Sequence, residues 1–166
     1  MKKVILAAIC LGLFIIDNTM MPFLSVFGVM PSLLFCFVIS FSIINGEADA
    51  IFVGAISGII QDIYFPNVFG VNALCNLIIC YIAAVVGHNI FTNRKMVPIF
   101  ISGAAAIVKY ILVFLIMRVI GITILLDRKM IIMAVLNMIV TFFIYYSVFD
   151  LCKKEFMKKQ WNFAEK

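Results

Sequence analysis

The sequence predicts an all-α integral membrane protein with six transmembrane helices. Hydrophobic residues make up 66% of the 166 residues and charged residues 13%, whereas soluble domains are about 45–50% apolar and about 25% charged. The apolar residues form long runs and do not alternate with polar ones, which favours helices over an outer-membrane barrel. Because every connection between the runs is short, we expect one membrane domain over residues 1–166 and no soluble domain.

Six apolar segments are expected to form the helices, and prolines at their edges cost few backbone hydrogen bonds. The segments span residues 4–23, 31–44, 48–65, 71–88, 97–118 and 130–150, followed by a basic tail over residues 151–166. The first segment follows Lys2 and Lys3 as a signal peptide would, but no small-residue cleavage site follows Ile16, so we expect an uncleaved helix. The second and third segments are shorter than the ~20 residues of an upright span, which predicts tilt or shielding by neighbours.

The distribution of basic residues predicts that both termini are cytoplasmic. An even number of helices puts both ends on one side, and cytoplasmic sides of membrane proteins are enriched in Lys and Arg. With the N-terminus inside, nine basic residues lie in the cytoplasm and three outside; the outer ones are Arg118, Arg128 and Lys129. The Lys-rich tail is expected to contact anionic lipid, and the chain has no room for a folded basic domain that would bind nucleic acid.

Residues able to carry catalysis are nearly absent. Five cysteines form no CxxC pair, so they are expected to be small packing residues and not a disulfide or zinc framework. The only histidine, His88, lies at a helix end without a second metal ligand nearby in the sequence, which favours an interfacial residue over a metal ligand or proton carrier. No hydrolase, nucleotide-binding or metalloprotease motif occurs. We therefore expect no enzyme activity, no cofactor and no metal.

A stripe of small residues on the third segment is the best candidate for a contact surface. Gly54, Gly58 and Asp62 follow one another at four-residue spacing, which places them on one helix face. Small residues let a neighbouring backbone come close, and the carboxylate must face protein or water. Two interpretations stay open: packing against another helix of the same chain, or a groove for a partner's helix.

A second candidate is a layer of buried polar residues. At ~1.5 Å rise per residue, Asp17, Asp62 and Lys109 all lie ~18–21 Å from the cytoplasmic face, and the asparagines Asn72, Asn76 and Asn137 enter the same outer half from the other side. Lone charges cost about 2.5–3.5 kcal/mol each at this depth, so Lys109 is expected to pair with Asp62 or Asp17. The layer either locks helices together or contacts a ligand or partner.

The residues around the glycine stripe resemble a known family. The resemblance rests on Gly54-x3-Gly58-x3-Asp62, on the turn with Pro66, on Gly70-x-Asn72-Ala73-Leu74 and Tyr81, and on the preceding Gly28-x2-Pro31-x-Leu33-Leu34. This pattern is similar to MreD, the rod shape-determining membrane protein of bacteria, although Ser32 stands where the family often has an acidic residue. Length, basic start, six helices and basic tail agree with it.

The resemblance implies a non-enzymatic scaffold of the cell-elongation machinery that makes peptidoglycan. Implied partners are MreC, whose single membrane helix would lie on the glycine stripe, the actin-like MreB, RodA and a class B penicillin-binding protein. Pro66, Gly70 and Asn72 would belong to the outer contact surface with the stripe. MreD proteins also resemble the substrate-binding subunits of energy-coupling-factor transporters in architecture. A vitamin-type transport subunit, with the polar layer lining its pocket, is therefore the alternative function.

Overall fold

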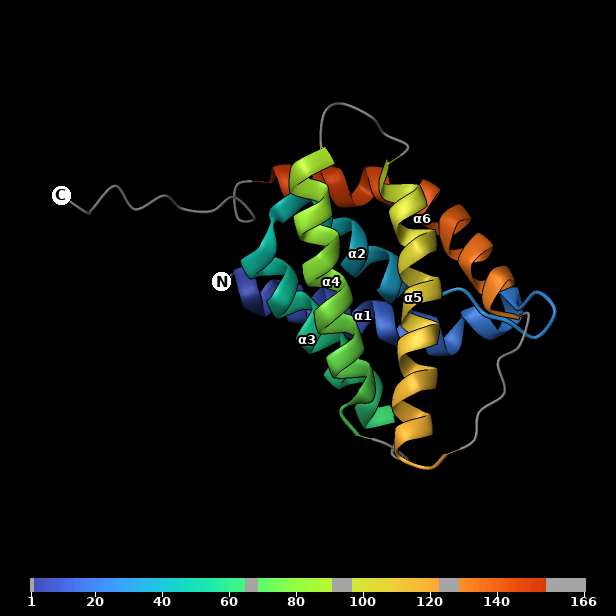
Figure 1. Cartoon of the computed structure of the whole chain (residues 1–166). Helices are drawn as coiled ribbons and strands as arrows, with labels where there is room; N and C mark the ends of the chain where they lie inside the picture. The colour runs from blue at the N-terminus through green and yellow to red at the C-terminus, as the bar shows by residue number, and fades with distance from the viewer. Residues whose placement is uncertain (1, 65–68, 91–96, 123–128, 155–166) are drawn as a thin grey trace.

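The helix at the centre of the bundle is α2 (Leu33–Asn45), in which every residue from Leu34 to Ile43 is buried. The computed structural model describes residues 2–64, 69–90, 97–122 and 129–154. Around α2 lie α1 (Lys2–Thr19), α3 (Glu47–Tyr64), α4 (Val71–Ile90), α5 (Val97–Val119) and α6 (Lys129–Lys153). Figure 1 shows α2 behind α4 and α5. Within the described residues the fold is all-helical, since the one β-bridge, between Val26 and Val29, is isolated.

Glycines and polar side chains set the helix ends. Ser32 caps α2 by accepting a hydrogen bond from the Phe35 amide, which satisfies one of the unpaired N–H groups of the first turn. At the other end, Gly46 has φ of +86°, a conformation that glycine adopts without strain. Glu47 and Asp49 then lie in the first turn of α3, where negative charge favours the helix dipole.

The first helix is shorter than the expected span of residues 4–23. It ends at Thr19, and the 3-10 helix η1 (Met21–Leu24) follows, with Pro22 in its first turn. Proline has no N–H to continue an α-helix and its ring crowds the preceding turn, which explains the early end.

A tight turn follows η1. Val26 and Val29 exchange two backbone hydrogen bonds of 3.0 Å, and the two residues between them, Phe27 and Gly28, both have positive φ, of 53° and 75°. This is the geometry of a two-residue hairpin turn in which Asn and Gly are preferred. Phe27 is 82% exposed, so its ring is not held inside the bundle.

Both ends of the described chain lie at the same end of the bundle. Lys2 forms an ion pair with Asp49, with 2.6 Å between Nζ and Oδ2, which joins the start of α1 to the start of α3. Asn45 donates a hydrogen bond to Cys152 Sγ at 3.0 Å, which joins the end of α2 to the end of α6. In Figure 1 these helix ends lie on the side of the N label.

Two helices of the described residues are long and apolar enough to cross a membrane, Pro98–Val119 and Lys129–Lys153. Two more, Leu33–Asn45 and Val71–Gly87, are apolar but shorter. The remaining two, α1 and α3, have 18 residues and three charged side chains each, most of them at the helix starts. The six expected crossings therefore divide into two that length and composition support and four shorter or more polar helices.

Candidate functional site

Asp62 joins α3 to the start of α4. Its side chain is 1% exposed, and each carboxylate oxygen accepts two hydrogen bonds. Oδ2 accepts from the amides of Gly70 and Ala73 at 3.0 and 2.9 Å, and Oδ1 accepts from the Asn72 amide and side chain at 3.0 and 3.1 Å. The first amides of a helix lack partners within the helix and carry its positive dipole end. This carboxylate is therefore fully used in capping α4.

Asp17 does the same for α2. It accepts hydrogen bonds from the Leu33 and Leu34 amides at 2.7 and 3.0 Å and from the Ser32 hydroxyl at 2.9 Å. Asp17 and Asp62 are each the third residue from the end of their helix, α1 and α3. Two helix pairs are thus held in the same way, by a carboxylate near the end of one helix at the start of the next.

The glycine stripe packs against α4 of the same chain. A Cβ on Gly58 would lie 2.3 Å from Ala73 Cα and 2.5 Å from Asn72 O, and one on Gly54 would lie 2.9 Å from Asn76 O. All three are backbone atoms, so no side chain can move to make room. The groove for a partner's helix, one of the two interpretations of this stripe, is therefore occupied by α4, and the contact is one within the chain.

Lys109 does not pair with an aspartate. Its ammonium donates a hydrogen bond to Gln61 Oε1 at 2.9 Å and lies 5.0 Å from the centre of the Phe35 ring. The one ion pair among the described residues is that of Lys2. The expected direct pairing of Lys109 with Asp62 or Asp17 is wrong, because the ammonium contacts Gln61 while backbone amides hold the two carboxylates at the starts of α2 and α4. Both carboxylates still attract the charge of Lys109 from farther away.

Asn137, on α6, lies fully buried beside the start of α2. Its Oδ1 accepts a hydrogen bond from the Ser32 amide at 3.1 Å, and its carbonyl and side-chain oxygens both accept from Cys36 Sγ. A further polar contact, from the Thr141 hydroxyl to Ser102 at 2.7 Å, joins α6 to α5. Within the described residues, Asn137 Nδ2 and Asn76 Oδ1 are buried without a partner, which is costly and calls for water or a ligand.

Some predicted residues fall outside what the structure describes. Pro66 lies in residues 65–68, and the His88 side chain is also outside the described part. Four of the cysteines are buried and Cys152 is partly exposed, all as free thiols. Among the described side chains no group of three His, Cys, Asp or Glu residues could hold a metal ion.

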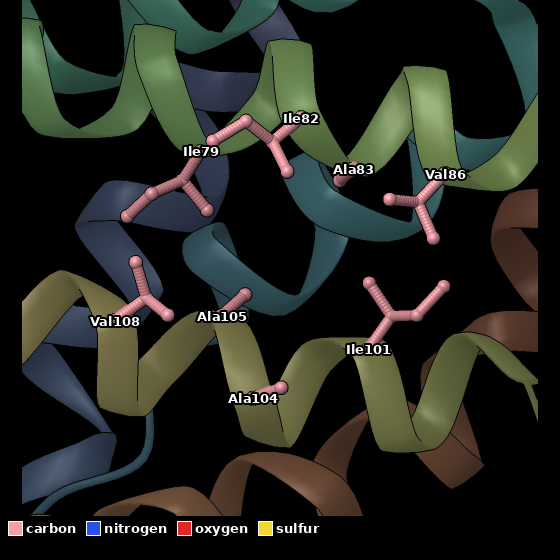
Figure 2. Close-up of a pocket in the computed structure, with 8 residues that line it drawn as sticks. All are labelled: Ile79, Ile82, Ala83, Val86, Ile101, Ala104, Ala105 and Val108. Carbon is pink, nitrogen blue, oxygen red and sulfur yellow. The ribbon is translucent and has the colours of Figure 1, made fainter.

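An apolar groove that sequence reasoning missed lies between α4 and α5. Its volume is about 180 Å³, and Figure 2 shows aliphatic side chains of the two helices facing each other across it. They are Ile79, Ile82, Ala83, Val86, Ile101, Ala104, Ala105 and Val108. The groove exists because small alanine side chains lie where α4 and α5 face each other. It could not be predicted because a single sequence does not show that these two helix faces meet.

Large apolar side chains cover the outside of the helices, and the polar ones turn inward. Val4, Ile63 and Phe143 are 73%, 69% and 71% exposed, whereas Asp62, Asn76 and Asn137 are at most 1% exposed. This is the distribution of a helical membrane protein, in which lipid surrounds the apolar faces and buried polar groups find partners inside.

The chain belongs to the MreD family. The family model, described as rod shape-determining protein MreD, matches residues 1–155, which is nearly the whole chain and confirms the family resemblance of its sequence. No curated protein and no solved structure matches it. The family is one of shape-determining proteins of the membrane.

Proposed function

We propose that this protein is a non-enzymatic scaffold subunit of the bacterial cell-elongation machinery. The observation that carries the proposal is the family match over residues 1–155. In this proposal the chain binds MreC and works with MreB, RodA and a class B penicillin-binding protein in peptidoglycan synthesis. The Lys-rich tail binds anionic lipid.

The scaffold crosses the cell membrane six times in this proposal, with both termini in the cytoplasm. The contacts of Lys2 with Asp49 and of Asn45 with Cys152 support it, because they bring the start of α1 and the end of α6 to one end of the bundle. Local thinning of the bilayer lets the shorter helices span, and the excess of basic residues at that end supports a cytoplasmic location for it.

The groove between α4 and α5 is the surface on which a partner's membrane helix docks. It replaces the glycine stripe, which α4 occupies. Ala104 is exposed in the groove, and Ala83 and Ala105 are buried in it. Small residues let helix backbones approach closely, and close packing drives helix association in lipid.

Co-purification of MreC from native membranes tests the proposal. The wild-type chain is expected to recover MreC, and Ala104→Leu, which puts an isobutyl group into the groove, is expected to lose most of it. Ala8→Leu is the matched control, since Ala8 is also exposed but lies on α1, away from the groove. Equal recovery of MreC by both variants would move the docking surface elsewhere, and no recovery by the wild type would reject the scaffold.

The buried polar layer favours a second candidate, a substrate-binding subunit of a vitamin-type transporter. Its support is the pair of unpartnered atoms, Asn76 Oδ1 and Asn137 Nδ2, together with the Lys109 ammonium. The same purification separates the two functions. Co-recovered ATPases or a tightly held vitamin would favour the transporter, and MreC favours the scaffold.

A further inference from the structure

The chain between α1 and α2 exposes a cluster of large apolar side chains. Phe23 and Phe27 are 88% and 82% exposed, and the sequence holds no charged residue between Asp17 and Glu47. Figure 1 shows this segment on the side of the bundle away from the N label. The exposed residues of the cluster are Met20, Phe23, Leu24, Val26, Phe27 and Met30. An exposed apolar cluster of this kind marks a contact with another molecule or with lipid.

The backbone of this segment does not tolerate the hydrocarbon core of a membrane. Its 3-10 helix, η1, is four residues long, and the turn that follows uses the amides of Val26 and Val29 for its two hydrogen bonds. Among the described residues, the amides of Phe27 and Gly28 between them have no hydrogen-bond acceptor. Because unpaired amides are costly in hydrocarbon, irregular backbone that faces lipid does not occur there. The turn therefore needs water or lipid headgroups beside it.

Helix lengths place the segment near one boundary of the membrane. The start of α1 and the end of α2 lie at one end of the bundle, where Lys2 and Asn45 make their contacts. From that end α1 extends about 26 Å to Thr19 and α2 about 18 Å to Leu33, whereas the hydrocarbon core is about 30 Å thick. The two ends of the segment thus lie about 4 and 12 Å short of the opposite boundary, a distance that the connecting residues can cover. The turn lies close to the headgroups on that side.

The apolar surface of α1 continues into the segment. Ile16 is exposed on α1, and Met20 follows four residues later with its amide still bonded to the Ile16 carbonyl at 2.8 Å, so the two side chains share a face. Phe27 holds a positive φ, which costs free energy for a residue with a Cβ. Its exposed ring gains little from contacts within the bundle, so a contact outside the chain is needed to offset this cost. Lipid, which covers the neighbouring face of α1, is the most direct partner.

We propose that residues 20–30 anchor the protein in the headgroup boundary of the membrane. The rings of Phe23 and Phe27 insert among the upper parts of the acyl chains. The backbone of the turn stays among the headgroups, where water pairs its free amides. This boundary is the one layer of a membrane that accepts both the rings and the amides. With both termini in the cytoplasm, the anchor lies in the outer leaflet. The inference rests on the proposed crossing of the membrane but not on the role in cell shape or on MreC.

Fluorescence of a single tryptophan in the turn tests the anchor. Trp161 is the only tryptophan of the chain, so Phe27→Trp in a Trp161→Phe background carries one reporter. The protein is reconstituted in lipid nanodiscs whose acyl chains carry bromine, a quencher, either near the headgroup or near the chain end. We expect stronger quenching by the shallow bromine and emission at shorter wavelength than that of free tryptophan in buffer. Emission as in buffer, quenched by dissolved iodide and by neither lipid, would overturn the proposal and leave the rings for a protein partner.

Two further reporters separate the possible failures. Phe23 lies in η1 without a positive φ, so Phe23→Trp reports on the same segment if Phe27→Trp does not fold, and it is expected to show the same shallow quenching. Phe143→Trp is the matched control, because Phe143 is also exposed but lies fourteen residues after the start of α6 and ten before its end. It is expected to be quenched more by the deep bromine.

The control also fixes what each negative result means. Deep quenching of Phe23→Trp and Phe27→Trp as strong as that of Phe143→Trp would overturn the anchor, because the segment would then lie in the hydrocarbon core. No quenching of Phe143→Trp by either lipid would reject the membrane crossing on which the anchor rests.

Discussion

Gly58→Ala is expected to destabilise the protein strongly, although it adds a single methyl group. The new Cβ would lie 2.3 and 2.5 Å from the Cα and N atoms of Ala73, whereas carbon atoms pack best about 3.5–4.0 Å apart. The end of α3 and the start of α4 would have to separate by about 1 Å or more. The Ala73 amide also donates to Asp62 at 2.9 Å, so the same movement weakens the cap of α4.

The expected loss follows from these contacts. Overpacking a close contact costs about 1–3 kcal/mol, and the upper end applies because backbone and not side-chain atoms are in the way. For a chain of this size 3 kcal/mol corresponds to about 6–12 °C in the unfolding temperature. Thermal unfolding of the purified protein in detergent measures it.

Two other glycines provide matched controls for the same substitution. A Cβ on Gly12 would meet nothing within 4 Å, and one on Gly103 would meet the flexible side chain of Met138 at 2.6 Å. Gly12→Ala is expected to lose no stability, since alanine favours a helix over glycine by about 1 kcal/mol. Gly103→Ala is expected to lose less stability than Gly58→Ala, because a flexible side chain and not backbone is in the way. If Gly58→Ala unfolds at the same temperature as Gly12→Ala, the close contact of α3 with α4 is wrong.

Three further measurements test other parts of the structure. Asp62→Asn replaces an oxygen that accepts two hydrogen bonds by a donor and is expected to cost about 2–3 kcal/mol; an unchanged unfolding temperature would contradict the cap. Phe27→Asn is expected to stabilise the protein by about 1 kcal/mol, because asparagine tolerates positive φ better, and a loss would reveal a stabilising contact of the ring. A membrane-impermeant maleimide should label Cys152 in inside-out vesicles, and labelling in intact cells would exclude a cytoplasmic C-terminus.

The helices could be predicted from the sequence because apolar runs are long and end at recognisable residues. The end of α3 at Tyr64 and the start of α4 at Val71 lie within a residue of the predicted bounds. The end of α1 at Thr19 was missed because the apolar run continues past Pro22. Hydropathy stays high across Pro22, so it does not predict the helix end. The missing N–H of proline and the position of its ring do predict it.

The site was predictable in its residue types and not in its contacts. Spacing showed that Gly54, Gly58 and Asp62 share a face, but which helix covers that face depends on packing. Equal depth placed Lys109 in one layer with Asp62, yet depth says nothing about the direction in which each side chain points. Three of the groups that donate hydrogen bonds to Asp62 are backbone amides. Every residue except proline has such an amide, so the pattern of side chains in the sequence could not predict which ones Asp62 would bind.

Cell width after depletion of this protein in its own bacterium tests the central claim most directly. If the chain is a subunit of the cell-elongation machinery, depleted cells lose rod shape and become wide or round. Re-expression of the wild type or of Ile59→Leu restores rods, and Gly58→Leu does not, because Gly58 is packed against α4 and Ile59 is 42% exposed. Depleted cells that keep their width through several generations would contradict the claim.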